Sequence, residues 1–190
     1  MRTFIAITLP KEIKDFLARI QDTLKESGAD VKWVNPENIH LTLKFLGEVD
    51  DATLIKAEYI LQEVAKNKNP FYLGISSVGA FPKVEAARVI WAGIHQGETE
   101  TKMIAKEFED KFAKVGIPAE ERAFSAHITL GRTRSGLNRQ NLAQKLHALV
   151  QSHQEGVGFR VTKITLFKST LTPKGPVYDI LKEGSLHTTN

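Results

Sequence analysis

The sequence contains no cysteine, which excludes disulfide bonds, thiolate zinc sites and a cysteine nucleophile. It also lacks an apolar run near the roughly 18 residues that a membrane-spanning helix needs. Residues 1–10 do not provide a secretory signal, because threonines interrupt their apolar run and Pro10 ends it before a cleavage site. These absences predict a cytoplasmic protein with no membrane partner.

A large excess of charge of either sign is also missing. The 26 Lys and Arg residues outnumber the 22 Asp and Glu residues to give a net charge of +4. This value suits a polyanionic partner such as RNA, and it is equally ordinary for a soluble protein. Hydrophobic residues make up 42% and charged residues 25% of the 190 residues, which is typical of a globular protein with a real core. We therefore expect residues 1–190 to form a single domain and the protein to be a monomer.

Hydrophobic periodicity predicts the order strand, helix, strand, helix, strand in the first half of the chain. Alternation of apolar and polar residues predicts strands over residues 4–9, 39–46 and 71–78. Helical spacing of apolar residues predicts one helix from 13 to Gly28 and a second helix that ends near 64. Asp50 or Asp51 is expected to cap the second helix.

The second half repeats this order. Strands are predicted over residues 87–94, 124–130, 159–171 and 177–181. Thr99 is expected to cap a helix that closes at Gly116, and Asn138 is expected to open another. The repeated order, with no linker between the halves, predicts two similar lobes. Since helices do not alternate with every strand, the fold class should be α+β with mostly antiparallel sheets and the helices outside.

Two predicted strands share a motif. His40-Leu41-Thr42-Leu43 lies in the first half, and His127-Ile128-Thr129-Leu130 lies at the equivalent place in the second half. Because a strand alternates its faces, the histidine and the threonine of each motif should project together, away from the core. Each strand then offers one imidazole and one hydroxyl on its polar face.

Chance explains only part of this pattern. The composition gives about half an accidental match to His-x-Thr, whereas the chain has three. The third match, His187-Thr188-Thr189, lies in a tail without alternation, and we assign it to chance. The alternative is that the other two histidines are half-exposed strand residues without a functional role. Their equivalent positions in the two halves argue against this alternative.

Paired histidines suit the cleavage of a phosphodiester. A histidine with a pKa near 6.5 can give or take a proton at neutral pH, so two facing histidines can act as acid and base in one turnover. The hydroxyls of Thr42 and Thr129 can donate hydrogen bonds to phosphate oxygens where negative charge builds up. Such chemistry needs no metal or other cofactor, and carboxylates that could bridge two metal ions do not cluster near either histidine.

The motifs and their surroundings resemble the two-histidine (2H) phosphoesterase superfamily. Within it, the segments that contain Trp33 and the motif through Gly47 are similar to the RNA 2′,3′-cyclic phosphodiesterases, also known as the 2′-5′ RNA ligase or LigT-like family. The similarity extends over residues 88–93, from the second motif to Arg132, and over residues 169–178. It therefore spans nearly the whole chain.

The resemblance implies a bilobal α+β fold with a pseudo-twofold central cleft. It implies a metal-independent hydrolase whose substrate is RNA ending in a 2′,3′-cyclic phosphate, or a cyclic nucleotide, and whose product is a 2′-phosphate. Under that scheme we assign His40 as proton donor and His127 as proton acceptor, with Thr42 and Thr129 beside the phosphate. It also assigns Arg132 to the phosphate or the base.

Two features depart from simple expectation around the second motif. Ala126 stands where the family usually has proline, which relaxes the entry to the strand before His127. Arg132 lies five residues after His127, so strict alternation would turn it to the opposite face. A bulge at Gly131 would aim Arg132 back toward the site.

Weaker candidates surround these residues. Lys44 has the parity of His40 and is a possible phosphate contact or a solvated lysine. Four aromatic residues could stack on a base, although core packing explains most of them: Trp33, Phe81, Trp91 and Tyr178. A basic group could contact the RNA backbone or be merely solvated: Arg132, Arg134 and Arg139. Three histidines lack a threonine partner and are expected on the surface or in helices: His95, His147 and His153.

Two alternatives to the hydrolase stay open. The same scaffold could run the reverse reaction as a 2′-5′ RNA ligase acting on tRNA halves. Water at about 55 M favours hydrolysis unless a 5′-hydroxyl is held in place. A non-catalytic nucleotide or RNA-binding module is the third reading, and the presence of both complete motifs argues against it.

Overall fold

A computed structural model describes residues 1–152 and 156–187 of the chain. His153 and the threonines of the third His-x-Thr match, Thr188 and Thr189, lie outside the described residues.

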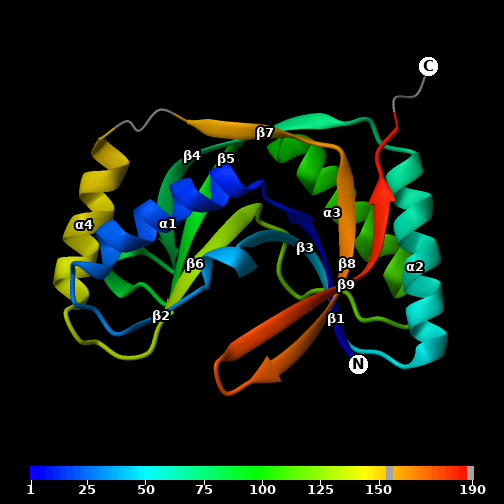
Figure 1. Cartoon of the computed structure of the whole chain (residues 1–190), viewed down its shortest axis with the longest axis horizontal. Helices are drawn as coiled ribbons and strands as arrows, with labels where there is room; N and C mark the ends of the chain where they lie inside the picture. The colour runs from blue at the N-terminus through cyan, green and yellow to red at the C-terminus, as the bar shows by residue number, and fades with distance from the viewer. Residues whose placement is uncertain (153–155, 188–190) are drawn as a thin grey trace.

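Within the described residues, nine strands form two antiparallel sheets (Figure 1). The four-stranded sheet has the order β3 (His40–Glu48), β1 (Arg2–Thr8), β8 (Lys163–Thr172), β9 (Gly175–Ser185). The five-stranded sheet has the order β2 (Val31–Trp33), β6 (His127–Thr133), β5 (Val89–Gln96), β4 (Phe71–Phe81), β7 (Val157–Val161). The predicted α+β class with antiparallel pairing is confirmed.

Four helices cover the outer faces of the sheets, two to each sheet. Helices α2 (Asp51–Lys66) and α3 (Glu98–Ala113) pack against the four-stranded sheet and against each other. Helices α1 (Lys11–Lys25) and α4 (Arg139–Gln151) pack against the five-stranded sheet. In Figure 1 the two pairs stand at opposite ends of the molecule, which gives the two lobes expected from the sequence.

Each lobe draws strands from both halves of the chain. The four-stranded sheet joins β1 and β3 to β8 and β9, through the pairing of β1 with β8. The five-stranded sheet joins β2 and β4 to β5, β6 and β7. The repeated order of elements therefore does not correspond to two consecutive lobes, and neither sheet is complete without both halves.

Strand β1 shows how one sheet presents two different faces. Ile5 and Ile7 are fully buried in the main core beneath the helices. Their neighbours Phe4 and Ala6 point the other way and form a small separate cluster with Phe167 and, at its margin, Tyr178. This second face is the one that carries the first histidine motif.

Several element boundaries differ from the sequence-based expectation. Asp50 caps α2 as predicted, because its Oδ1 accepts a hydrogen bond of 2.8 Å from the Thr53 N–H. The Thr99 cap is wrong. The cap of helix α3 is Gly97, two residues earlier, and its φ of 78° turns the chain through a left-handed conformation.

Other boundaries differ in length. Strand β6 begins at His127 rather than at residue 124, and the single strand predicted over 159–171 is two strands, β7 and β8, which belong to different sheets. Asn138 does precede α4, but its side chain donates to the Gly28 carbonyl instead of capping the helix. Among the described residues, no helix is long and apolar enough to cross a membrane.

Candidate active site

The first histidine is fixed by a turn that precedes its strand. A 3-10 turn over Pro36–Asn38 leads directly into β3. The Nδ1 of His40 lies 2.7 Å from the carbonyl oxygen of Asn38. A carbonyl can only accept, so the neutral imidazole must carry its proton on Nδ1. Its Nε2 then accepts a hydrogen bond of 2.9 Å from the hydroxyl of Thr42.

The second histidine repeats this arrangement. The Nδ1 of His127 lies 2.7 Å from the carbonyl oxygen of Ser125, again two residues earlier in the chain. Its Nε2 has no recorded hydrogen-bond partner in the part of the chain that the structure describes. Ala126, in place of the family's usual proline, is buried between them and does not prevent this geometry. Both neutral imidazoles therefore leave Nε2 as the nitrogen available for proton transfer.

Aromatic rings border both imidazoles. The ring of Phe4 lies 4.9 Å from that of His40, and the ring of Tyr178 meets His40 edge-on at 5.4 Å. The ring of Phe81 meets His127 edge-on at 5.2 Å. Of the four aromatic residues suggested as base-stacking candidates, Phe81 and Tyr178 thus contact the motif histidines.

The surroundings of His40 change its acidity. Burial lowers the pKa of His40 below its ordinary value of 6.5, and the hydrogen bond to the Asn38 carbonyl opposes that effect only in part. Burial also raises the pKa of the neighbouring Tyr178 hydroxyl above its ordinary value. In the free protein, His40 is therefore more readily neutral than an exposed histidine.

Both motif strands contain a bulge at the leucine of the motif. In β3, Thr42 pairs with Ala6 while Lys44 pairs with the next residue along β1, so Leu43 is the extra residue. In β6, Thr129 pairs with Trp91 while Gly131 pairs with the next residue along β5, so Leu130 is the extra residue. A bulge reverses the alternation of faces beyond it. The motifs are thus alike in backbone as well as in sequence.

The bulge in β6 brings Arg132 onto the same face as the motif. Arg132 pairs with Val89, two residues from Trp91 on β5, and Trp91 shares the face of Thr129. The bulge is held from the other side by Gln21, whose buried Nε2 donates to the Leu130 carbonyl at 2.8 Å. The bulge suggested by the sequence is therefore present, one residue before Gly131.

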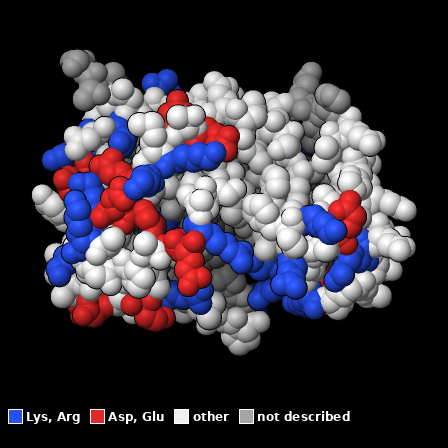
Figure 2. Space-filling model, turned by 180° about the vertical axis from the view of Figure 1, so that it is seen from behind, with Lys and Arg blue, Asp and Glu red and all other residues white. Residues whose placement is uncertain are grey.

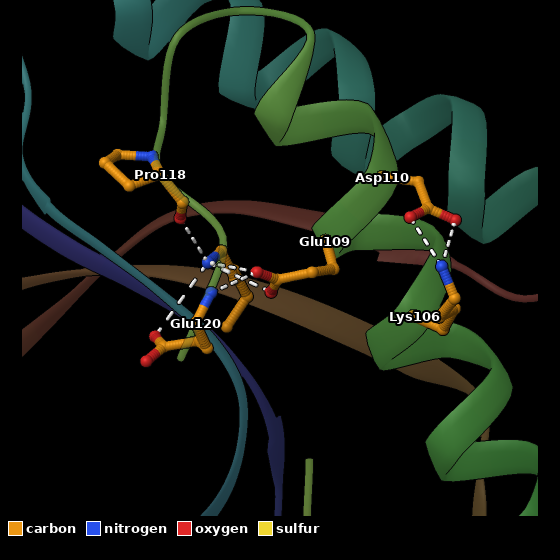
Figure 3. Close-up of polar contacts among 6 residues, drawn as sticks. Lys106, Glu109, Asp110, Pro118 and Glu120 are labelled. Carbon is orange, nitrogen blue, oxygen red and sulfur yellow. Dashed lines mark hydrogen bonds and ion pairs between the residues drawn. The ribbon is translucent and has the colours of Figure 1, made fainter. Parts of the chain in front are cut away.

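The bulge in β3 has the opposite consequence for Lys44, and the proposed phosphate contact of this residue is wrong. The Lys44 side chain is turned away from the His40 face and is only 1% exposed. Its ammonium contacts the Glu109 carboxylate at 3.0 Å and donates to the Pro118 carbonyl at 3.0 Å. Figure 3 shows Glu109, Pro118 and Glu120 converging on this point, between α3 and the segment that leads to His127.

Phe45 takes the place on the site face that Lys44 was expected to occupy. Its ring lies 6.1 Å from that of Phe4, and the residue is 53% exposed. Trp33, by contrast, packs against the main core with Val31, on the opposite face from Arg132. Trp91 lies on the site face, where its indole leaves no room for a Cβ at Gly79; at Gly93 the Ser77 Oγ leaves none, and the indole lies close by.

The two motifs come together because β3 and β6, the end strand of one sheet and an inner strand of the other, contact each other. The helix-free faces of both sheets supply the imidazoles, the threonine hydroxyls and Arg132.

The weaker candidates lie away from the motifs. Arg134 and Arg139 are exposed beyond the end of β6, and His147 contacts Glu85 at 3.1 Å on the α4 side. His95 is an exposed residue near the carboxyl end of β5. No group of three or more His, Cys, Asp or Glu side chains that could hold a metal occurs within the described ranges.

Known proteins are similar to this chain over nearly its whole length. The family model described as LigT-like phosphoesterase matches residues 7–91 and 96–178. The RNA 2′,3′-cyclic phosphodiesterase of Methanothermobacter thermautotrophicus is 37% identical over 178 residues, which cover 94% of this chain and 95% of that protein. The protein of the same name from Aquifex aeolicus is 35% identical and covers 96% of each chain.

Solved structures of similar proteins share the fold. A crystal structure of a protein from Thermus thermophilus superimposes with a TM-score of 0.81, at 28% identity, over 98% of both chains. The crystal structure of Escherichia coli LigT complexed with 3′-AMP superimposes with a TM-score of 0.74, at 25% identity, over 97% of both chains.

Proposed function

The chain belongs to the LigT-like phosphoesterase family, and on that basis we propose that His40 and His127 open the 2′,3′-cyclic phosphate of an RNA end to a 2′-phosphate. Its activity is that of an RNA 2′,3′-cyclic phosphodiesterase, the activity for which its relatives are named. The observation that carries the mechanism is the matched pair of imidazoles, each held through Nδ1 by the carbonyl two residues before it.

The reaction uses the Nε2 atoms of the two histidines in opposite ways. His127 takes a proton from a water molecule, whose oxygen forms a bond to phosphorus. The bond between phosphorus and the ribose 3′-oxygen breaks, and His40, protonated on both nitrogens, gives its Nε2 proton to that oxygen. The product keeps the phosphate on the 2′-oxygen. Exchange with solvent then returns each histidine to its starting state.

The lowered pKa of His40 bears directly on this assignment. A proton donor must hold its proton when the substrate binds, and burial works against that in the free protein. The negative charge of a bound phosphate has the opposite effect, because it favours the imidazolium form. When Nε2 is protonated, the Thr42 hydroxyl no longer needs to donate to it and can turn toward a phosphate oxygen instead.

The remaining residues hold the substrate. Thr42 and Thr129 donate to the non-bridging oxygens as their charge grows, and Arg132 supplies a guanidinium on the same face. Phe81 and Trp91 beside His127, and Tyr178 beside His40, offer apolar surfaces for the nucleoside. The substrate is RNA with a cyclic phosphate end or a small cyclic nucleotide.

A direct assay tests this proposal. We expect the protein to convert adenosine 2′,3′-cyclic phosphate to adenosine 2′-phosphate in the presence of EDTA. His40→Ala or His127→Ala should each lower the rate by about 10² to 10⁴, and the double variant should lose far less than the product of the two. His147→Ala is the matched control, since its imidazole contacts Glu85 on the outer side, away from both motifs.

Each outcome of this assay separates the candidate functions. An unchanged rate in His40→Ala would remove the two-histidine mechanism, and binding without turnover would leave a nucleotide-binding module. If the protein joined the cyclic phosphate end to an RNA with a 5′-hydroxyl faster than it hydrolysed that end, its activity would be that of a 2′-5′ RNA ligase. A cytoplasmic location and a monomeric state are part of the same proposal, and light scattering after gel filtration tests the latter.

A further inference from the structure

Two cations stand directly opposite each other on the face that carries the second histidine motif. Lys32 of β2 pairs with Arg132 of β6, and paired residues of antiparallel strands share a face. The flanking residues Val31 and Trp33 pack against the core on the other face, where a Cβ on Gly131 would meet both of them. Lys32 therefore extends on the same face as Arg132, Thr129 and His127.

Like charges placed opposite each other destabilise a sheet unless something lies between them. Both side chains are exposed, and neither has an ion pair with a carboxylate among the residues that the structure describes. The backbones of Arg88 and Arg134 lie at the same corner, since the Arg88 carbonyl accepts from the Thr133 N–H of β6 and the Arg134 N–H donates to the Asp30 carbonyl beside β2. Neither of these two guanidinium groups has a described ion-pair partner.

The lysines of helix α3 differ from Lys32 in having acidic partners. On α3, each of three lysines contacts a carboxylate within 3.0 Å: Lys102, Lys106 and Lys111. Figure 2 shows blue and red atoms interleaved over the side covered by α2 and α3, and a group of mainly blue atoms low on the molecule toward the other lobe, beyond which blue and red atoms again lie together. Lys32 and Arg132 thus form an exposed pair of cations that has no ion pair with a carboxylate in the part of the chain that the structure describes.

We propose that Lys32, together with Arg132, binds the phosphodiester on the 5′ side of the terminal nucleotide. The proposal rests on the proposed function, because it extends the substrate from the reacting end into the RNA chain. Successive positions on one face of a strand lie about 7 Å apart, so Arg132 follows Thr129 at a spacing comparable to that between neighbouring phosphates of a nucleic-acid strand. A phosphate between Lys32 and Arg132 also relieves their mutual repulsion.

This placement makes Lys32 responsible for the difference between two substrates. A nucleoside 2′,3′-cyclic phosphate ends at its 5′-hydroxyl and cannot contact the Lys32 site. A dinucleotide with the same cyclic end carries one additional phosphodiester and can. The wild-type enzyme should therefore have a higher kcat/KM for the dinucleotide, and this preference should weaken as salt rises, because the additional contact releases counterions.

The test is the kinetics of Lys32→Met with adenosine 2′,3′-cyclic phosphate and with the dinucleotide ApA 2′,3′-cyclic phosphate. We expect the variant to lose about tenfold in kcat/KM on the dinucleotide, mainly through KM, and to keep the wild-type rate on the mononucleotide. The slope of log(kcat/KM) against log[salt] for the dinucleotide should fall by about one. Lys32→Glu should lose more, again on the dinucleotide alone.

Lys106→Met is the matched control, because it removes an exposed lysine from the opposite side of the molecule, and it should behave as wild type with both substrates. Equal losses on both substrates, or no loss on either, would overturn the Lys32 site while leaving the hydrolase intact. Failure of the wild-type protein to act on either substrate would instead contradict the proposed function. Thermal unfolding of both variants checks that a loss of rate is not a loss of fold.

Discussion

At the scale of single residues, the backbone sets the chemistry of the two histidines. The carbonyls of Asn38 and Ser125 each accept from an Nδ1, so both rings have the same tautomer. The rings differ at Nε2, because the Nε2 of His40 accepts a hydrogen bond from the Thr42 hydroxyl and no such bond is described for His127. A pair with equal orientation and unequal surroundings is what separate roles as acid and base require.

We expect His40 to titrate below pH 6.5 in the free protein, because burial lowers its pKa. Adding inorganic phosphate should raise that pKa, since a bound anion stabilises the imidazolium. NMR of the imidazole Cε1–H signals, assigned with His40→Ala, measures both values. A pKa that stays depressed with phosphate bound would reverse the roles assigned to His40 and His127.

The same shift affects folding. A histidine whose pKa is lower in the folded than in the unfolded chain binds its proton more tightly when unfolded. Protonation of His40 therefore does not change the free energy of unfolding well above pH 6.5, the pKa in the unfolded chain. Below that pH it lowers the free energy of unfolding, increasingly so until the pH reaches the folded pKa. His40→Ala should make unfolding less sensitive to acid across that window, as urea titrations at several pH values would show.

The motif residues could be predicted from the sequence because they repeat within one chain. The carbonyl partners could not, since a carbonyl carries no side-chain signal and depends on the turn before each strand. Lys32 was missed because its three-residue strand is too short to show alternation. Lys44 was placed on the face of His40, because periodicity does not show that one extra residue in β3 reverses the parity and gives that face to Phe45.

At the scale of elements, the bulge in β3 creates a buried ion pair. The Lys44 side chain is 1% exposed and its Glu109 partner 25%. Removing one member of a buried pair leaves an uncompensated charge, so Lys44→Met should destabilise the protein by about 3 kcal/mol. Urea unfolding measures this change.

The control for Lys44 lies on α3, the helix that carries its partner Glu109 (Figure 3). Lys106 and Asp110 form an exposed pair one turn apart on α3. Lys106→Met should change stability by no more than about 0.5 kcal/mol. Combining Lys44→Met with Glu109→Gln should recover part of the lost stability, because the double variant no longer leaves the Glu109 charge alone. Equal effects of Lys44→Met and Lys106→Met would contradict the role of burial.

Close packing of strands β4 and β5 fixes Trp91 beside the second motif. A Cβ on Gly79 would stand 2.4 Å from the Trp91 indole, so the ring would have to shift. Gly79→Ala should therefore cost about 1 to 3 kcal/mol in stability, shift the tryptophan fluorescence and lower activity. Gly136→Ala is the control, since its Cβ would meet nothing closer than 3.8 Å. Unchanged fluorescence in Gly79→Ala would show that the indole is not confined as described.

Most strands and helices follow from local hydrophobic periodicity, because each has one face in the core. The boundary between β7 and β8 could not be predicted in this way. The two strands are separated only by Thr162 and both alternate, yet they pair with different sheets. Which sheet a strand joins is decided by pairing partners far away in the chain, and periodicity carries no information about that choice.

At the scale of the whole molecule, the exchange of strands between lobes ties their stability together. Strand β1 pairs with β8 in one sheet, and β2 pairs with β6 in the other. Each sheet contains strands from both halves of the chain, and the two sheets contact each other through β3 and β6. Unfolding one sheet therefore removes that contact and loosens segments that flank the strands of the other sheet. A site assembled from two sheets in this way should persist or disappear as a unit.

We expect unfolding to be a single cooperative transition, although the molecule has two lobes. Both tryptophans of the chain, Trp33 and Trp91, lie in the five-stranded sheet, so their fluorescence reports that lobe. The His40 imidazole signal reports the four-stranded sheet. In urea the two probes should give the same midpoint and the same slope, as a two-state transition requires. Separate midpoints would mean that each sheet folds by itself, and residues 1–190 would then be two domains rather than the one that the exchanged strands predict.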